Sequence, residues 1–227
     1  MNSQNSQDSQ SLQGSRNAQG SQRVQDSPRA QTGAAARRVT YTPDSLLEVA
    51  VTVFNERGYD GTSMEDLARA AGITKSSIYH HVKGKEELLT RGVNRALDAL
   101  NASLDTLEAL PDGELDRVEQ AVFRAVQILV DELPYVTLLL RVRGNTEAER
   151  AAQASRRAID QRLAGFVERA AAAGALRTDL DPRLASRLVF GMVNSVVEWY
   201  RPGPGRWSAD DVASAVTHVV FDGLRRR

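Results

Sequence analysis

The stretch Thr62–Lys85 contains polar and cationic side chains at spacings that suit contact with DNA. Its sequence, TSMEDLARAAGITKSSIYHHVKGK, predicts two short helices joined by a tight turn, with a third helix starting at its end. In the second helix, Ile78 and Val82 are expected to point inward. The side chains left outside can hydrogen-bond base edges or phosphate oxygens. They are Thr74, Lys75, Ser76, Ser77, Tyr79 and His80.

Two lysines near the start of the third helix extend this surface. Lys83 precedes that helix and Lys85 lies in its first turn. A helix N-terminus attracts anions and an added cation strengthens the attraction, so phosphate is the expected ligand there. The whole chain has 29 basic and 29 acidic residues, so its positive charge is only local. Local charge on a neutral protein favours site-specific binding over the indiscriminate binding of a basic architectural protein.

Capping and small residues predict the elements that position these side chains. Thr62 is expected to cap the first helix, with Glu65 completing a capping box. Ala68 allows close approach of the second helix, and Gly72 supplies the positive φ that a helix-ending turn needs. A capped helix with outward lysines is often only a solvated surface. The coincidence of cap, small residue, glycine turn and buried Ile78 instead favours a helix-turn-helix that reads DNA.

A set of residues between Tyr41 and Leu89 carries a family pattern. They are Ala50, Phe54, Gly58, Tyr59, Thr62, Ser63, Leu67, Ala68, Gly72, Ile78, Tyr79, His81, Val82, Lys85, Glu86 and Leu88. This stretch resembles the N-terminal domain of the tetracycline-repressor (TetR) family of bacterial regulators. The resemblance implies that Tyr79 and Lys85 hold the DNA backbone and that residues between Thr74 and His80 read the groove. Thr62 completes our set of expected DNA contacts.

Composition argues against several other classes of protein. No cysteine is present, which excludes disulfides, thiolate catalysis and cysteine-bound zinc. Three histidines occur, and no Ser-His-Asp spacing, phosphate-binding glycine loop or metal-ligand cluster is found. We therefore expect no catalytic residue, no metal and no cofactor. No apolar run approaches the roughly 20 residues of a membrane span, and no secretory signal is visible, so the expected compartment is the cytoplasm.

The chain is predicted to contain three parts. Residues 1–38 are dominated by Ser, Gln, Asn and Gly, and are expected to form a disordered basic tail. Arg37 and Arg38 are its best candidates for contact with the DNA backbone, although we favour a purely solubilising role. Residues 39–86 are expected to form the helix-turn-helix DNA-binding domain. Residues 87–227 are expected to form an effector-binding and dimerisation domain.

The fold is expected to be all-α, because no alternating strand pattern appears. The first helix is predicted to run from its cap at Thr42, with Pro43 at its first position, to a stop at Gly58. A long helix is expected over residues 85–110, ended by Pro111. Further helices are predicted over 114–132, 134–143, 146–173, 181–200 and 208–226. The third of these is rich in Arg, Glu and Ala and is expected to be largely solvated.

The last two predicted helices have the composition of a dimer interface. Residues 184–200 and 208–226 are rich in apolar side chains. Gly191 and Ser195 lie four residues apart on one face, so another helix could approach closely there. Two such helices from each of two copies would form a four-helix bundle, as the family resemblance implies. A homodimer also suits double-stranded operator DNA, because two helix-turn-helix units can reach successive major grooves.

The same domain is expected to enclose an effector cavity, as the family resemblance implies. Apolar residues that could line it are Phe123, Val126, Leu138, Leu139, Phe166, Phe190 and Met192. Polar groups that could orient a ligand are Arg141, Arg143, Asn194 and Trp199. Arg141 is the preferred candidate, because a buried arginine is unusual. For each apolar residue, a purely structural place in the core is the alternative.

The segment VEWYRPGPGRWSADDV, residues 197–212, is similar to a Trp-Tyr-x-Pro-Gly-x-x-Ser stretch. That stretch recurs in family members that regulate fatty-acid, phenylacetate or sterol-ring breakdown and respond to acyl-CoA thioesters. A shared loop geometry is the alternative explanation. We therefore expect a homodimeric repressor released by a small-molecule effector, with an acyl-CoA thioester as the candidate. A non-CoA hydrophobic compound or drug as effector, and activation in place of repression, stay open alternatives.

Overall fold

The computed structural model describes residues 42–111, 113–177 and 179–225, and these residues form helices and connecting loops. Among them the one β-type contact is an isolated bridge between Leu176 and Arg225, so the expected all-α fold is confirmed. The predicted tail, with its arginines, lies outside the described residues. The helices are α1 (Pro43–Arg57), α2 (Met64–Ala70), α3 (Lys75–Ile78), α4 (Lys85–Ala109), α5 (Glu114–Asp131), α6 (Leu133–Arg141), α7 (Glu147–Ala172), α8 (Pro182–Trp199) and α9 (Ala209–Leu224).

Helix α1 forms where the sequence predicts it because both of its ends are capped. The Thr42 hydroxyl accepts the Ser45 amide N–H at 3.1 Å, and the Ser45 hydroxyl accepts the Thr42 amide N–H at 2.9 Å. Gly58 follows the helix with a φ of 80°, a left-handed value that favours glycine. The buried residues between these ends are Leu46, Leu47, Ala50, Val51, Val53 and Phe54.

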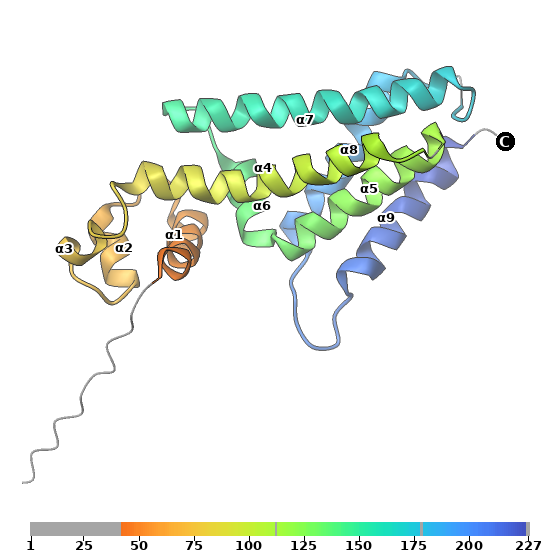
Figure 1. The fold of residues 1–227 in the computed structure, drawn as a ribbon. Helices are drawn as coiled ribbons and strands as arrows, with labels where there is room; N and C mark the ends of the chain where they lie inside the picture. The colour runs from red at the N-terminus through yellow and green to blue at the C-terminus, as the bar shows by residue number, and fades with distance from the viewer. Residues whose placement is uncertain (1–41, 112, 178, 226–227) are drawn as a thin grey trace, which may run out of the picture. The chain divides into compact units, whose positions relative to one another are not determined.

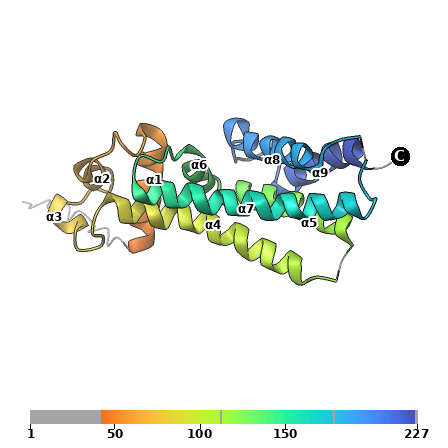
Figure 2. The same cartoon turned by 90° about the horizontal axis from the view of Figure 1, so that it is seen from above.

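Helix α4 runs without interruption from the helix-turn-helix into the larger domain (Figures 1 and 2). It packs against α1, α5, α6 and α7. At Gly92 this packing is tight, since a Cβ built there would lie 3.0 Å from Leu138 Cδ2 and 3.1 Å from Val51 Cγ2. Such distances are shorter than ordinary carbon contacts. Helices α1, α4 and α6 therefore meet at a position where any side chain would displace a neighbour.

Helix α7 differs from the expected, largely solvated element. It packs against α4, α5 and α8 (Figure 1). It buries an apolar stripe in which Phe166 has no exposed surface. Ile159 and Leu163 belong to the same stripe. On a more exposed side, Arg162 Nη2 donates to Asp105 Oδ1 of α4 at 2.7 Å. The prediction from composition missed this stripe, because alanines and charged residues occupy the positions between its large apolar side chains and dominate the composition of the helix.

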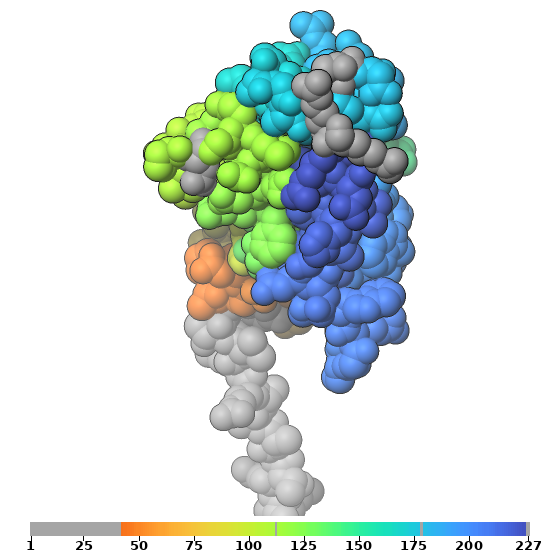
Figure 3. Space-filling model, turned by 90° about the vertical axis from the view of Figure 1, so that its right-hand side faces the viewer, coloured from red at the N-terminus to blue at the C-terminus, as the bar shows by residue number. Residues whose placement is uncertain are grey.

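The α8–α9 connection extends beyond the start of α9 (Figures 1 and 3). Tyr200 is buried, and its hydroxyl donates to the Trp207 carbonyl oxygen at 3.0 Å. Arg201 Nη2 donates to the Glu198 carbonyl oxygen at 3.1 Å, at the end of α8. Ser208 then caps α9. These polar groups build the connection itself, which favours loop geometry as the explanation of the sequence pattern at 197–212.

Candidate functional site

Helices α2 and α3 form the predicted helix-turn-helix. The turn after α2 contains Gly72 with a φ of 67°, and the Ile73 amide N–H donates to the Ala68 carbonyl oxygen at 3.0 Å. Thr74 caps α3 as predicted, because its hydroxyl accepts the Ser77 amide N–H at 3.2 Å. Local capping thus sets the direction in which α3 leaves the turn.

The two faces of α3 and the turn after it separate as predicted. Ile78 has no exposed surface and Val82 has 3 %, so this side packs on the core of the domain. Val82 does not belong to the helix as predicted, because α3 ends at Ile78 and Val82 follows the turn. The exposed side chains on the other side are Thr74, Lys75, Ser76, Tyr79 and His80. Ser77 is half-buried. One short surface therefore presents hydroxyl, ammonium, phenol and imidazole groups together, a set able to contact both bases and phosphates.

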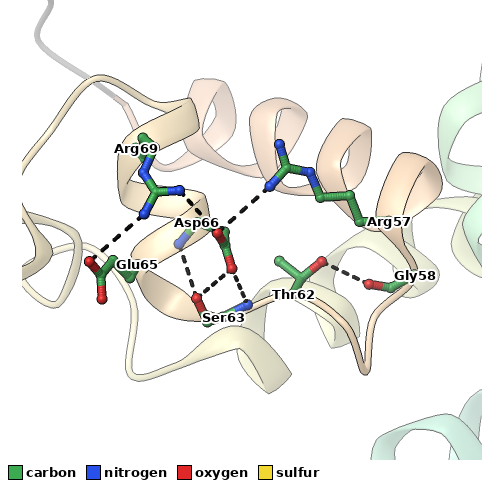
Figure 4. A network of polar contacts seen from close by, with 7 residues as sticks. All are labelled: Arg57, Gly58, Thr62, Ser63, Glu65, Asp66 and Arg69. Carbon is green, nitrogen blue, oxygen red and sulfur yellow. Dashed lines mark hydrogen bonds and ion pairs between the residues drawn. The ribbon is translucent and has the colours of Figure 1, made fainter.

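The predicted cap of α2 is wrong by one residue. Ser63 is the N-cap: its hydroxyl accepts the Asp66 amide N–H at 3.1 Å, and Asp66 accepts the Ser63 amide N–H at 3.0 Å (Figure 4). Thr62 is 2 % exposed, and its hydroxyl donates to the Gly58 carbonyl oxygen at 2.7 Å. We therefore remove Thr62 from the expected DNA contacts. Sequence could not separate Thr62–Glu65 from Ser63–Asp66, because both pairs have the spacing and chemistry of a capping box.

Asp66 also joins α2 to α1. Its Oδ1 lies 3.4 Å from Arg69 Nη1 and 3.7 Å from Arg57 Nη1 of α1 (Figure 4). Hydrogen bonds from the Ser63 hydroxyl and amide, and then the charges of the two arginines, hold the pKa of the Asp66 carboxyl below its ordinary value. The carboxylate therefore stays charged at neutral pH, where it fastens the cap to the end of α1.

Lys85 has partners inside the protein that sequence reasoning missed. Its Nζ donates to the carbonyl oxygens of Tyr59 and Thr62, each at 3.0 Å, and lies 4.4 Å from the centroid of the Tyr59 ring. These contacts fasten the first turn of α4 to the α1–α2 connection. One of the three ammonium N–H groups remains for a phosphate. Contact between Lys85 and DNA stays a prediction.

The start of α4 is also less open to an anion than expected. Gly84 is the N-cap and has no side chain, and the Glu87 carboxylate accepts the Lys83 amide N–H at 2.7 Å. Glu87 also pairs with Arg91, at 2.6 Å. A carboxylate of the protein thus occupies the helix end that we predicted for phosphate. The side chain of Lys83 itself is exposed.

The larger domain encloses a small apolar cavity of about 40 Å³ between α4, α5, α6, α7 and α8. Leu139, Phe190 and Asn194 line it, as predicted. The other polar residues at the cavity are Arg156 and Asp160 of α7, which sequence reasoning missed. The volume is far below that of a drug-sized ligand site. A larger ligand would have to move the lining helices.

The polar groups from α7 were missed because that helix was expected to be solvated. Asp160 keeps much of its surface exposed, but partial burial raises the pKa of its carboxyl, against the opposing charges of Arg156 and Arg187. The Asp160 carboxyl, the Arg156 guanidinium and the Asn194 amide therefore lie at a cavity that is otherwise apolar. They are suited to orient the polar part of a bound molecule.

Three of the four predicted polar effector contacts, Arg141, Arg143 and Trp199, lie away from this cavity. Arg141 is exposed rather than buried, and its Nη1 donates to the Asn55 carbonyl oxygen at 2.8 Å. Trp199 is 49 % exposed, and its ring centroid lies 6.5 Å from that of Trp207. Both residues end their helices, where the chain is open to solvent. The expected apolar residues that do not line the cavity are Phe123, Val126, Leu138, Phe166 and Met192.

Helices α8 and α9 and their connection leave an apolar face exposed, which we call the α8–α9 face. Leu188 is 60 % exposed and Val219 is 64 % exposed. A Cβ built on Gly191 would meet no atom within 4 Å. The exposed large apolar side chains of this face are Leu184, Leu188, Met192, Trp199, Trp207 and Val219. A groove of about 420 Å³ runs between the two helices. Clustered exposed apolar side chains of this kind are typical of protein interfaces.

Two sequence-family profiles match the chain. The profile described as "Bacterial regulatory proteins, tetR family" matches residues 46–91, and "Tetracyclin repressor-like, C-terminal domain" matches residues 111–224. The chain belongs to the TetR family of transcriptional regulators. Regulators of this family bind operator DNA and dimerise. In the part of the chain that the structure describes, no helix is long and apolar enough to cross a membrane.

Individual TetR-family members are similar over most of their length. The transcriptional repressor KstR2 of Rhodococcus jostii (strain RHA1) is 32 % identical over 204 residues, covering 85 % of this chain and 93 % of KstR2. The crystal structure of SCO3833 from Streptomyces coelicolor A3 is 58 % identical, with a TM-score of 0.75 over 82 % of this chain and 94 % of that one. AibR, solved with isovaleryl coenzyme A and operator DNA, is 24 % identical, with a TM-score of 0.67 over 80 % and 98 %. The AibR likeness concerns the fold alone.

Paired substitutions test the capping of α2 in this TetR-family domain. Ser63→Ala should lower the free energy of unfolding by about 1 kcal/mol, because it removes the N-cap of α2. Glu65→Ala should change it by less than ~0.5 kcal/mol, because Glu65 has one exposed ion pair, with Arg69. Urea unfolding followed by circular dichroism measures both. A loss from Glu65→Ala that equals or exceeds the loss from Ser63→Ala would show that Ser63 is not the cap.

Proposed function

We propose that this chain is a homodimeric transcriptional repressor that a small-molecule effector releases from its operator. The observation that carries the proposal is the division of α3, in which Ile78 is fully buried while the polar side chains of the same turn are exposed. This division anchors the helix and offers hydrogen-bonding groups to a major groove. The relative KstR2 is a repressor, which favours repression over activation. A protein with this role would act on DNA in the cytoplasm.

The proposed DNA contacts divide by chemistry. Hydroxyl, ammonium and imidazole groups can hydrogen-bond base edges, whereas a phenol at the rim suits a phosphate oxygen. The residues assigned to base edges are Lys75, Ser76, Ser77 and His80. Those assigned to phosphates are Thr74, Tyr79 and, through its remaining N–H group, Lys85. Because the formal net charge of the chain is zero, we expect these local contacts rather than a general positive field to provide the affinity.

Tyr79→Phe and Ser77→Ala should affect DNA binding differently. Tyr79→Phe removes an exposed phenol O–H, so Kd should rise about fivefold on every sequence, as expected for one hydrogen bond worth about 1 kcal/mol. Ser77→Ala should instead change the preference at particular base pairs. Fluorescence anisotropy at one salt concentration, with DNA flanking the gene and with scrambled DNA, measures both effects.

Lys85→Ala is the control for a structural effect in the same experiment. It should lower the midpoint of thermal unfolding without DNA, because it removes two hydrogen bonds to backbone carbonyls. Tyr79→Phe should leave that midpoint unchanged, because the Tyr79 side chain is exposed. A Tyr79→Phe protein that binds both DNAs as tightly as the unsubstituted protein would contradict the phosphate assignment.

Dimerisation through the α8–α9 face is the second part of the proposal. The face corresponds to the predicted segments 184–200 and 208–226. The open space above Gly191 and the exposed Ser195 would let a helix of the partner approach closely. Association there would remove several large apolar side chains from water, which is the main driving force for such interfaces. It would also set the distance between two helix-turn-helix units.

A charge placed on the α8–α9 face should separate the protomers. Leu188→Glu should convert a dimer into a monomer at micromolar concentration, because a carboxylate would be desolvated in the interface. Asn94→Glu, on the exposed side of α4, adds the same charge outside the face and should leave the dimer intact. Analytical ultracentrifugation measures both masses. A Leu188→Glu protein that remains dimeric would rule out this face.

Helix α6 supports a route from the effector cavity to the DNA-binding domain. Leu139 lines the cavity, whereas Leu138 lies against α4. Arg141 donates to the Asn55 carbonyl oxygen of α1 at 2.8 Å, and the Asn55 side-chain amide donates to the Pro134 carbonyl oxygen at 2.8 Å. An effector that widens the cavity by displacing α6 would carry the movement to α1 through these contacts.

A population shift follows from that coupling. Two conformations that differ in the spacing of the helix-turn-helix units would differ in operator affinity, and the effector would favour the weaker-binding one. We propose residues 39–86 and 87–227 as the two domains involved, with α4 starting just before the boundary and continuing beyond it. The unbroken helix makes the two domains respond together.

An acyl-CoA thioester is the proposed effector. The mostly apolar cavity suits an acyl chain, and Arg156 and Asn194 offer hydrogen bonds to a thioester carbonyl. AibR, which has the same fold, is solved with isovaleryl coenzyme A. A non-CoA hydrophobic compound is the second candidate, because the cavity lining alone would accept one.

Acyl-CoA thioesters should release operator DNA, whereas the matching free acids and free CoA should not. Leu163→Phe adds volume to the cavity lining, so half-maximal release should need about fivefold more thioester, the equivalent of ~1 kcal/mol of overpacking. Its affinity for DNA without effector should not change. Fluorescence anisotropy across a series of chain lengths measures release. Release by free acids would favour the non-CoA candidate, and no release by any thioester would contradict the acyl-CoA assignment.

A further inference from the structure

A second hollow lies where α1 and the α1–α2 connection face the end of α6 and the α6–α7 connection. Its volume is about 520 Å³, which is within the range of small-molecule sites. It shares no lining residue with the effector cavity. We call it the junction cleft, and its charged lining residues are Arg57, Asp60, Arg141, Arg143 and Glu149.

The two acids of the junction cleft already have donors within the protein. Glu149 is 3 % exposed, and its carboxylate accepts the amide N–H groups of Arg143 at 3.0 Å and Thr146 at 2.9 Å. The negative charge of Glu149 thereby interacts favourably with the positive N-terminal end of the α7 helix dipole. Asp60 accepts the side-chain amide of Asn145 at 2.7 Å. Neither acid forms an ion pair with a cleft arginine within the described ranges.

The arginines of the junction cleft keep unused N–H groups. Arg141 gives one N–H group to a carbonyl of α1, and Arg57 lies 3.7 Å from a carboxylate of α2 in a pair whose arginine is exposed. The Arg143 guanidinium has no hydrogen-bond or ion-pair partner among residues 42–225 that are described. Tyr59 also lines the cleft. Burial, and then nearby carboxylates, raise the pKa of its phenol to about 12, so the phenol is a hydrogen-bond donor at neutral pH. The cleft lining therefore offers more unused hydrogen-bond donors than unpaired acceptors.

One acceptor in the lining is also left without a partner. Asn55 lines the junction cleft, and its Oδ1 is buried with no hydrogen-bond donor within the described part of the chain. A buried oxygen of this kind is costly unless something donates to it. Hydrogen phosphate and its esters offer several acceptor oxygens, which matches the excess of guanidinium donors. A P–O–H group would reach Asn55 Oδ1 once the Asn55 side chain turned toward the cleft.

We propose that the junction cleft binds a phosphate-bearing anion, held by Arg141 and Arg143 from the effector domain and Arg57 from α1. Two sources share this chemistry: an inorganic phosphate, and the coenzyme A portion of a thioester. The occupant ties α1 to the end of α6, so it stabilises the domain spacing described here. Binding of a free anion does not rest on the proposed function, whereas the coenzyme A source rests on the proposed acyl-CoA effector.

Isothermal titration calorimetry of the full chain with pyrophosphate, at constant ionic strength, tests the site. Arg143→Ala is the decisive variant, because its side chain has no partner to lose and its thermal midpoint should not change. Its Kd for pyrophosphate should rise about tenfold or more, as expected for loss of charge-assisted hydrogen bonds. Arg157→Ala removes an exposed arginine of α7 outside the cleft and should bind like the unsubstituted protein. Hydrogen exchange should show protection at residues 54–61 and 138–149.

A titration with free CoA identifies the source of the anion. CoA binding that Arg143→Ala abolishes assigns the cleft to the CoA of a thioester, and pyrophosphate binding without CoA binding assigns it to a free anion; each result supports the site. Equal Kd values for the unsubstituted and Arg143→Ala proteins, protection elsewhere, or no binding at millimolar pyrophosphate would overturn it. Operator release by acyl-CoA is measured separately with DNA, so failure of the cleft and failure of the repressor proposal are distinguishable.

Discussion

The close packing of α1 and α6 on α4 around Gly92 is the constraint on which the rest of the structure depends. Helix α4 keeps its backbone hydrogen bonds from Lys85 to Ala109, so one rigid element belongs to both domains. Val51 and Leu138 approach it so closely that an added methyl group would displace them. Packing of this density transmits a displacement rather than absorbing it. A movement of α6 should therefore displace α1 as well.

The DNA-reading surface depends on this packing more than on its own helix propensity. Helix α3 spans only Lys75–Ile78, and a helix so short is not stable in isolation. Its orientation comes from buried Ile78, from the cap of α2 at Ser63, and from Lys85, which fastens α4 to the carbonyls of the α1–α2 connection. A surface held by tertiary contacts can be moved by them, which is what a regulator requires.

The two hollows on either side of α6 differ for a physical reason. The proposed effector cavity is small and mostly apolar, because the helices that line it pack inward and keep their side chains in contact. The junction cleft is lined by guanidinium groups that water can solvate, so nothing drives it to close. Ligands would act on them differently, opening the cavity by pushing helices apart and bridging the cleft by drawing two domains together.

The sequence by itself determined the helices, because their limits depend on residues within one or two turns. Outside the helix-turn-helix, the structure places helix ends within two residues of prediction, whereas α3 ends at Ile78, four residues before Val82. Thr42, Gly58, Gly72 and Thr74 act locally as expected. Only the tertiary structure decided which polar side chains are free. It buried Thr62 and left Ser63 as the cap, bound Lys85 to carbonyls 23 and 26 residues away, and exposed Arg141 and Trp199 at helix ends. Capping and periodicity are short-range and readable from the chain, whereas burial and hydrogen-bond partners are set by segments that meet only after folding.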